Sequence, residues 1–347
     1  MGTFGAGTNE FYVSQLIPTS GTLSNFVFRF STNPGADPSY YWIVGIRVNG
    51  STLYTDTVSD TEQLGVINTD VSVSAGDVVA FSFQPSAFPS TPADAQVATT
   101  CYFEPDTDGE TILMGMTGAN TISVSADRFM AMYGRTIPTG TEGNYWQPIP
   151  TDGTLKKLYV EQDRDAGSGS DAYRYTLRLN GADTSVTTTL TVPDTAGNDT
   201  TNTASVSAGD YLTLRVEPVD TPGSAPRVRY SCVFVSDTSG EFLILGGTTN
   251  SLNTSSTEYN GLPTHYYNWN GSELFQCILH PCTLSKFNVI LNGAPGASTD
   301  YTFNLYIDGA DSNSEVTIAD TATYGIDSTN TDYIGNNSLP ISMKVVP

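Results

Sequence analysis

Ile149-Pro150-Thr151-Asp152-Gly153-Thr154-Leu155 is a heptapeptide that the chain contains twice. Ile17-Pro18-Thr19-Ser20-Gly21-Thr22-Leu23 is the same stretch with one change, 132 residues earlier. A weaker copy, Pro281-Cys282-Thr283-Leu284, follows 129 residues after the quoted stretch. Self-similarity at a fixed long period is typical of a chain built from repeated structural units. The sequence therefore predicts three tandem units.

Composition indicates the class of those units. The 347 residues exceed the usual size of a single domain, and only 14% of them are charged whereas 11% are aromatic. β-branched and aromatic residues alternate with clusters of Gly, Asn and Asp, which is typical of strands separated by turns. We therefore expect an all-β protein.

The most regular strand pattern recurs once in each unit. Apolar residues alternate over residues 42–48, 173–179 and 301–307, which is the period of a half-buried strand. Each run ends in a dipeptide that tolerates positive φ angles: Asn49-Gly50, Asn180-Gly181 and Asp308-Gly309. Such dipeptides predict two-residue hairpin turns of type I′. An aromatic-bearing strand is expected to open each unit, as at Phe11-Tyr12-Val13 in the first.

A second long similarity lies at the end of the first two units. Residues 101–117 align without gaps onto residues 232–248, with eight of the seventeen positions identical. This pair predicts a closing hairpin, whose turn is the recurring acidic stretch at residues 106–110 and 237–241. The third unit reaches Pro347 before any such segment. A sandwich without these strands exposes an unpaired edge, so we expect another chain, or this chain's own first residues, to complete it.

The repeats divide the chain into three antiparallel β-sandwich units of the jelly-roll-like kind. The predicted boundaries are residues 1–117, 118–248 and 249–347, with the third unit lacking its closing hairpin.

The G-T-L strand, the Y-x-F-x-L-x-x-x-G hairpin and the S-A-G-D strand resemble β-sandwich modules of phage and other virus virion proteins. The Gly-Asp step followed by alternating apolar residues is similar to a late strand of the tumour-necrosis-factor-like jelly roll. The resemblance covers most of the chain and implies a non-enzymatic structural protein: a capsid decoration, vertex or fibre component. Its expected partners are capsid or other virion proteins and further copies of itself, with a trimer suggested by the jelly-roll analogy. The expected location is the virion surface, after synthesis in a host cytoplasm.

The formal net charge of −22 bears on other partners. A strongly acidic chain is repelled by a phosphate backbone and by anionic lipid, so direct nucleic-acid and membrane binding are not expected. Residues 1–7 contain neither the basic segment nor the apolar core of a secretory signal.

One acidic loop is a candidate cation site. Asp163, Asp165 and Asp171 offer three carboxylates among glycines and serines, and calcium prefers such hard oxygen ligands. The loop lacks the bidentate glutamate of an EF-hand, so a solvated Gly-Ser loop is the favoured interpretation. No other cofactor is expected.

One aromatic stretch is a candidate interface or ligand surface. Tyr266, Tyr267 and Trp269 lie outside the repeat pattern and beside asparagines, where aromatic rings can stack on a sugar or anchor a protein. Plain packing is an equally good interpretation. This stretch supports the alternative function, an extracellular carbohydrate-binding or adhesin-type module. A glycosidase ranks third, because nothing in the sequence places two carboxylates across a cleft.

The histidines and cysteines provide little evidence for a catalytic, disulfide or metal site. Neither His265 nor His280 recurs in another unit or accompanies a nucleophile motif, so no catalytic residue is predicted. Cys101 and Cys232 hold equivalent positions and are expected to pack in separate cores. Cys277 and Cys282 could close a small loop or bind a metal with His280, but free thiols are favoured.

Overall fold

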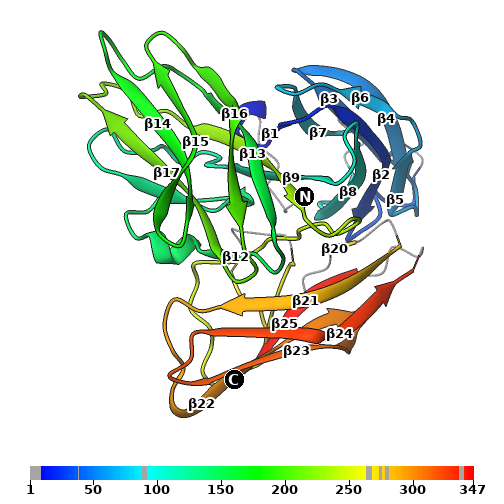
Figure 1. Cartoon of the computed structure of the whole chain (residues 1–347). Coiled ribbons are helices and arrows are strands. Elements are labelled where there is room, and N and C mark those ends of the chain that lie inside the picture. The colour runs from blue at the N-terminus through cyan, green and yellow to red at the C-terminus, as the bar shows by residue number, and fades with distance from the viewer. Residues whose placement is uncertain are drawn as a thin grey trace.

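The structure is a computed structural model that describes residues 9–37, 39–86, 92–262, 268–272, 276–277, 281–335 and 340–347. Strands form nearly all of its regular structure, in sheets whose pairs are antiparallel apart from one short parallel pair. Three β-sandwich units surround a common centre (Figure 1). The prediction of an all-β chain built from sandwiches is confirmed.

Unit 2 is the most complete sandwich. One sheet has the strand order β10-β17-β14-β15 with β12 also on β17, and the facing sheet has the order β11-β9-β18-β13-β16. The bounds are β9 Glu110–Met116, β10 Arg128–Met130, β11 Gly134–Arg135, β12 Gln147–Pro148, β13 Gly153–Gln162, β14 Ala172–Leu179, β15 Ala182–Thr191, β16 Ala196–Val206, β17 Tyr211–Val219 and β18 Val228–Ser236.

Unit 1 has the same plan with fewer strands. Its two sheets are β1-β7-β3-β4, and β2 flanked by β8 on one edge and by β5 and β6 on the other. The bounds are β1 Gln15–Leu16, β2 Gly21–Phe30, β3 Tyr41–Val48, β4 Ser51–Ser59, β5 Leu64–Ile67, β6 Val71–Val73, β7 Val78–Pro85 and β8 Val97–Pro105.

Unit 3 has one full sheet and one reduced sheet. The order β19-β25-β22-β23, with β20 also on β25, matches the β17 sheet of unit 2, but β21 pairs only with β24 among the described residues. The bounds are β19 Glu258–Asn260, β20 Gln276–Cys277, β21 Cys282–Ile290, β22 Gly296–Ile307, β23 Ala310–Asp320, β24 Tyr324–Ile334 and β25 Pro340–Val346.

The predicted hairpin turns are confirmed in all three units. Asn49, Asn180 and Asp308 have φ angles of 50°, 52° and 51°, and the glycine after each is also left-handed. Asparagine and aspartate tolerate this region because their short polar side chains bond locally. The same geometry therefore joins β3 to β4, β14 to β15 and β22 to β23.

The predicted aromatic opening strand is wrong in the first two units. Glu10–Tyr12 is a 3₁₀ turn, η1, because the Asn9 side chain accepts a hydrogen bond from the Phe11 backbone N–H. Glu142–Tyr145 is a second such turn, η2, and only the two residues of β12 that follow pair with the sheet. The counterpart in unit 3 falls at residues 274–275, outside the described residues.

The predicted closing hairpin of unit 1 is also wrong. β8 pairs with β2 in unit 1, but β9 pairs with β18 in unit 2, so the two strands enter different sheets. The predicted boundary at residue 117 follows a strand whose hydrogen bonds belong to unit 2. Antiparallel neighbours in sequence need not pair when the second strand finds an open edge on an adjacent unit.

The three units contact one another in a cycle. β1, β12 and β20 are counterparts, because each pairs with the equivalent strand of its own unit. These strands are β7 in unit 1, β17 in unit 2 and β25 in unit 3. β1 contacts β18 and β13 of unit 2, β12 contacts β21 of unit 3, and β20 contacts β8 of unit 1. Each unit therefore presents the same element to the next one, as in a three-fold arrangement built within one chain.

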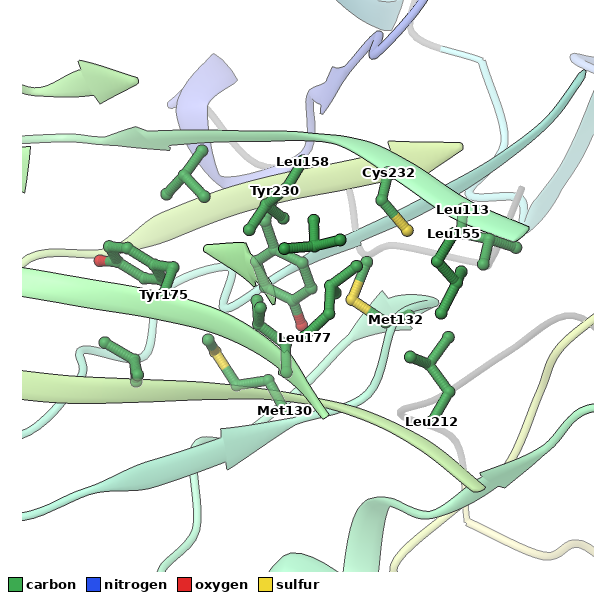
Figure 2. Packing of buried hydrophobic residues seen from close by; sticks show 14 of the residues in the cluster. Leu113, Met130, Met132, Leu155, Leu158, Tyr175, Leu177, Leu212, Tyr230 and Cys232 are labelled. Carbon is green, nitrogen blue, oxygen red and sulfur yellow. The ribbon is translucent and has the colours of Figure 1, made fainter. Parts of the chain in front are cut away.

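The cores differ in size along that cycle. Unit 2 contains a cluster of 25 buried apolar residues, part of which is drawn in Figure 2, and unit 1 a cluster of 13. The described part of unit 3 contains two separate clusters, of five and four residues. Because apolar burial is the main stabilising contribution to folding, unit 3 as described is the least stabilised sandwich.

Candidate functional site: the junctions between units

The junction of units 1 and 2 is an exchanged strand. β9 pairs with β18 in seven consecutive residue pairs, from Glu110 opposite Val235 to Met116 opposite Arg229. Its side chains alternate between two cores: Leu113 is fully buried among unit 2 residues (Figure 2), whereas Met114 packs in the unit 1 core. The period-two geometry of a strand makes this double burial possible. β9 therefore joins two sandwiches by hydrogen bonds on one edge and by apolar contacts on both faces.

A glycine allows β9 to approach β18 closely. A Cβ added at Gly115 would lie 2.4 Å from the ring of Tyr230. Tyr230 is fully buried, and its hydroxyl donates a 2.7 Å hydrogen bond to the Ala131 carbonyl. The aromatic ring thus fills the space that a side chain at residue 115 would need.

A buried carboxylate lies at the start of the exchanged strand. Glu110 accepts a 2.6 Å hydrogen bond from the Thr19 hydroxyl of unit 1 and a 2.8 Å bond from the Lys157 ammonium of unit 2. Lys156 lies 2.9 Å away on the same carboxylate, and the Glu110 side chain is completely shielded from solvent. Burial alone would raise the pKa of Glu110, but the lysines and the hydroxyl together hold it below its usual range. The carboxylate is therefore ionised and bonded across the junction.

The same triad recurs between units 2 and 3. Glu241 accepts a 2.6 Å hydrogen bond from Thr151 and a bond from Lys286 of unit 3, and Lys286 also bonds Thr151 at 3.0 Å. The Lys286 ammonium lowers the pKa of Glu241 below its usual range, and the Thr151 hydroxyl adds to this effect. Here the glutamate side chain is 27% exposed, so the second junction is more accessible to solvent than the first.

Backbone geometry brings each lysine to its glutamate. Lys157 and Lys286 adopt left-handed φ angles of 54° and 55° at irregularities in the pairing of β13 and β21. A lysine in this region is strained, because its Cβ crowds the following carbonyl. Asn25 holds the same position in β2, with φ of 52°, and has no ammonium group. The strain is therefore associated with an ion pair at the two junctions that carry the triad.

Two arginines, one just before β18 and one within it, extend the first junction. Arg229 makes a bidentate ion pair with Glu161, and its guanidinium lies 4.4 Å from the centroid of the Phe11 ring in η1. Arg227 stacks on Tyr12 in the same way, at 4.8 Å. Such cation–π contacts strengthen when they are shielded from water. The turn that precedes β1 is thereby held against unit 2.

The predicted calcium loop is organised by other bonds. Asp163 accepts hydrogen bonds from the Arg227 backbone and guanidinium, at 2.8 and 3.0 Å. Asp165 and Asp171 accept from backbone N–H groups of the loop itself, at Gly167 and Ser168. Within the described ranges, no group of three or more His, Cys, Asp or Glu residues could hold a metal ion. This geometry does not favour the calcium site, which stays a prediction.

Of the predicted aromatic surface, the structure describes only Trp269. Its ring is partly buried against the unit 3 core, with its centroid 6.4 Å from that of Phe303. Packing therefore accounts for this residue. Tyr266 and Tyr267 lie outside the described residues, as do His265 and His280.

The cysteines behave as the repeat predicts where they are described. Cys232 is fully buried in the unit 2 core, Cys101 packs against the unit 1 core, and both are free thiols, as is Cys282. Burial raises the pKa of Cys101 to about 11, which keeps the thiol protonated and unreactive. The side chain of Cys277 lies outside the described residues.

Sequence reasoning missed the junction triads, although a signal was present. Thr19 and Thr151 recur in the heptapeptide, and Glu110 and Glu241 recur in the acidic turn. The sequence predicts only a hairpin turn there, because nothing in one sequence indicates that its glutamate reaches another unit. A lysine at residues 157 and 286, two positions after each Leu of the heptapeptide copies, was the third part of the signal.

Comparison with known proteins adds no relative. The sequence matches no protein-family model and no curated protein. No helix in the described part of the chain is long and apolar enough to cross a membrane.

Proposed function

We propose that the chain is a non-enzymatic structural protein of a virion, a capsid decoration, vertex or fibre component that acts through protein–protein contacts. The observation that supports it best is the exchange of β9 between sandwiches. Strand exchange joins units by a continuous sheet, so a surface built in this way transmits load without a flexible linker. A virion is proposed as the particle because the strand motifs resemble β-sandwich modules of virion proteins.

The chemistry of the junctions is consistent with this role. Their charged groups are consumed in ion pairs and hydrogen bonds between units, as in the Glu110 and Glu241 triads. A reactive group needs an accessible partner and a cleft, whereas these groups stabilise an assembly. The negative surface that remains favours solubility at the high local concentration of a particle.

Electron cryo-microscopy of purified native particles tests the proposal. The expected result is density for three linked sandwiches in symmetric copies on a shell or fibre, in contact with another virion protein. A complete particle proteome without this chain, together with a shell map in which its density is missing, would overturn it. Static light scattering on the purified chain measures the proposed homo-oligomer separately.

A further inference from the structure

Among the described residues, the sheet of unit 3 that contains β21 has no counterpart of β18. In unit 2, β18 lies between β13 and the exchanged β9. In unit 3, β21 corresponds to β13, and residues 241–247 correspond to β9. Residues 241–247 form no strand, and no described residue pairs with β21 on the edge away from β24.

Exposure of residues 241–247 agrees with a missing neighbour. Leu243 and Leu245 are buried in the unit 2 core, and of their counterparts in β9, Met114 is buried and Ile112 partly buried in the unit 1 core. Ile244 is 44% exposed, whereas its counterpart Leu113 is fully buried against β18. Phe242 is 62% exposed on the same side. These two apolar side chains correspond to Thr111 and Leu113 of β9, of which Leu113 packs in the core of unit 2.

A second open edge lies on unit 1. β8 is the counterpart of β18, and it pairs with β2 on one edge only, as far as the described residues extend. β18 carries β9 on the corresponding edge. Because β20 of unit 3 contacts β8, this edge lies at the junction where the cycle of units returns to unit 1.

A pocket beside that edge has an unsatisfied polar side chain. It has a volume of about 220 Å³, and its lining includes Cys101 and Phe103 of β8, Leu243, Ile244 and Gln15. Gln15 is 3% exposed, and neither atom of its amide has a hydrogen-bond partner among the described residues. A buried amide without a partner is costly, so such a group indicates a ligand or a missing neighbour.

Unit 2 shows what bonds the oxygen of the equivalent amide, whose nitrogen has no hydrogen-bond partner among the described residues either. Gln147 is the counterpart of Gln15, and its side-chain oxygen accepts a 2.6 Å hydrogen bond from the Met132 backbone N–H. Met132 is fully buried in the unit 2 core, a few residues after β10. The continuous segment 97–133 thus supplies β8 to unit 1, β9 to unit 2, and the Met132 backbone N–H that bonds Gln147 of unit 2.

We propose that the junction of units 3 and 1 is the docking site for one segment of a partner protein, of the strand–turn–strand type that residues 97–133 represent. Its first strand lies between residues 241–247 and β21, its second strand pairs with β8, and an apolar residue that follows enters the pocket and donates its N–H to Gln15. The inference rests on the proposed function, because it names the surface through which the protein assembles. Residues 97–133 are engaged in this way at the junction of units 1 and 2, where β8 pairs with β2 and β9 with β18.

One substitution in the repeat defines the specificity of this site. A Cβ added at Gly21 would come within 2.4 Å of the Glu104 backbone oxygen and 2.7 Å of a ring carbon of Phe103. A Cβ added at Gly153 would come within 2.4 Å of the Val235 backbone oxygen and 2.5 Å of a ring carbon of Phe234. The third unit has Cys282 at this position. The partner strand therefore carries a small residue where β8 and β18 carry phenylalanine, and its backbone lies further from residue 282 than those of β8 and β18 lie from Gly21 and Gly153.

The test is titration calorimetry of the full chain with a synthetic peptide of residues 97–133 that contains the changes Cys101→Ser and Phe103→Ala. The expected result is saturable binding at one peptide per chain. The same peptide with its phenylalanine restored is expected to bind about tenfold more weakly, since overpacking at Cys282 opposes it. The Cys282→Gly chain is expected to remove that difference. Proline replacements at Thr99 and Leu113 in the peptide give the matched control, which should not bind.

Three results would overturn the proposal. These are no binding by the Phe103→Ala peptide, equal binding by the proline control, and an unchanged peptide preference in the Cys282→Gly chain. A chain that self-associates and is dissociated by the peptide would assign the site to a second copy instead of a partner protein. A chain that binds the peptide but is missing from particles would refute the virion role and leave the docking site standing.

Discussion

The two glutamate triads provide a matched pair of perturbations. Glu110→Gln and Glu241→Gln each remove one negative charge and keep the size of the side chain. Both disturb a bond from a threonine in one unit and a bond from a lysine in the next. Glu110 also pairs with Lys156, and Glu241 also accepts a hydrogen bond from Ser236. The carboxylates differ in exposure, since the Glu110 side chain is fully shielded and that of Glu241 is 27% exposed.

This difference sets the expected magnitudes. Breaking a buried pair leaves an uncompensated charge, so Glu110→Gln is expected to lower the free energy of unfolding by about 3 kcal/mol. An exposed pair is screened by water, so Glu241→Gln is expected to cost less than about 1 kcal/mol. Lys157 retains 28% exposure, which places the first value at the lower end of the range for buried pairs.

Urea unfolding followed by circular dichroism measures both costs. Lys157→Met completes a double-mutant cycle with Glu110→Gln, and the expected coupling is about 1–3 kcal/mol, because the two groups are in direct contact. Hydrogen exchange of the β9 amides is expected to speed up in Glu110→Gln, since the carboxylate fixes the start of that strand. Equal losses of unfolding free energy in the two glutamate variants, or a coupling energy near zero, would refute the assignment of Glu110 to a buried ion pair at the junction of units 1 and 2.

Three further predictions concern the same structure. The pKa of Glu110 is lowered from 4.5, so its contribution to folding stability is complete above that pH and is lost as the pH falls through the lower pKa of the folded state. The urea midpoint should therefore fall on acidification below about pH 4.5, and it should fall less in Glu110→Gln. Gly115→Val is expected to cost about 1–3 kcal/mol by overpacking against Tyr230, whereas Gly293→Ala, which has open space around it, should be neutral in the same unfolding assay. Asp199 accepts backbone bonds from β15 and β16 and has a pKa of about 2, so Asp199→Ala should lower the melting temperature measured by calorimetry and flatten the acid limb near pH 3.

Local sequence predicted much of the fold. The alternating runs that became β3, β14 and β22 and the Asn-Gly or Asp-Gly turns after them depend only on neighbouring residues, so a single sequence is sufficient to find them. The opening turns were not found, because the aromatic residues of η1 and η2 suit a strand by propensity. In η1 the Asn9 side chain accepts a hydrogen bond from the Phe11 backbone N–H, and this bond favours the 3₁₀ turn. Strand propensity does not take such a bond into account.

The candidate site depended on distances that the sequence does not contain. Thr19, Glu110 and Lys157 recur as Thr151, Glu241 and Lys286, so the sequence determined that these residues belong to the repeat. Only the tertiary structure decided that they meet, since each triad draws its three members from two units.

The pairing of β9 shows most clearly which features the sequence determines and which the tertiary structure decides. Its alternating side chains determine by themselves that both faces of the strand are buried, with Leu113 on one face and Met114 on the other. They do not determine which strand β9 pairs with, because the backbone N–H and C=O groups are chemically the same in every strand. The sequence alone determined the sandwich units and their period. The packing of one unit on the next decided that β9 leaves β8 and completes the sheet of its neighbour.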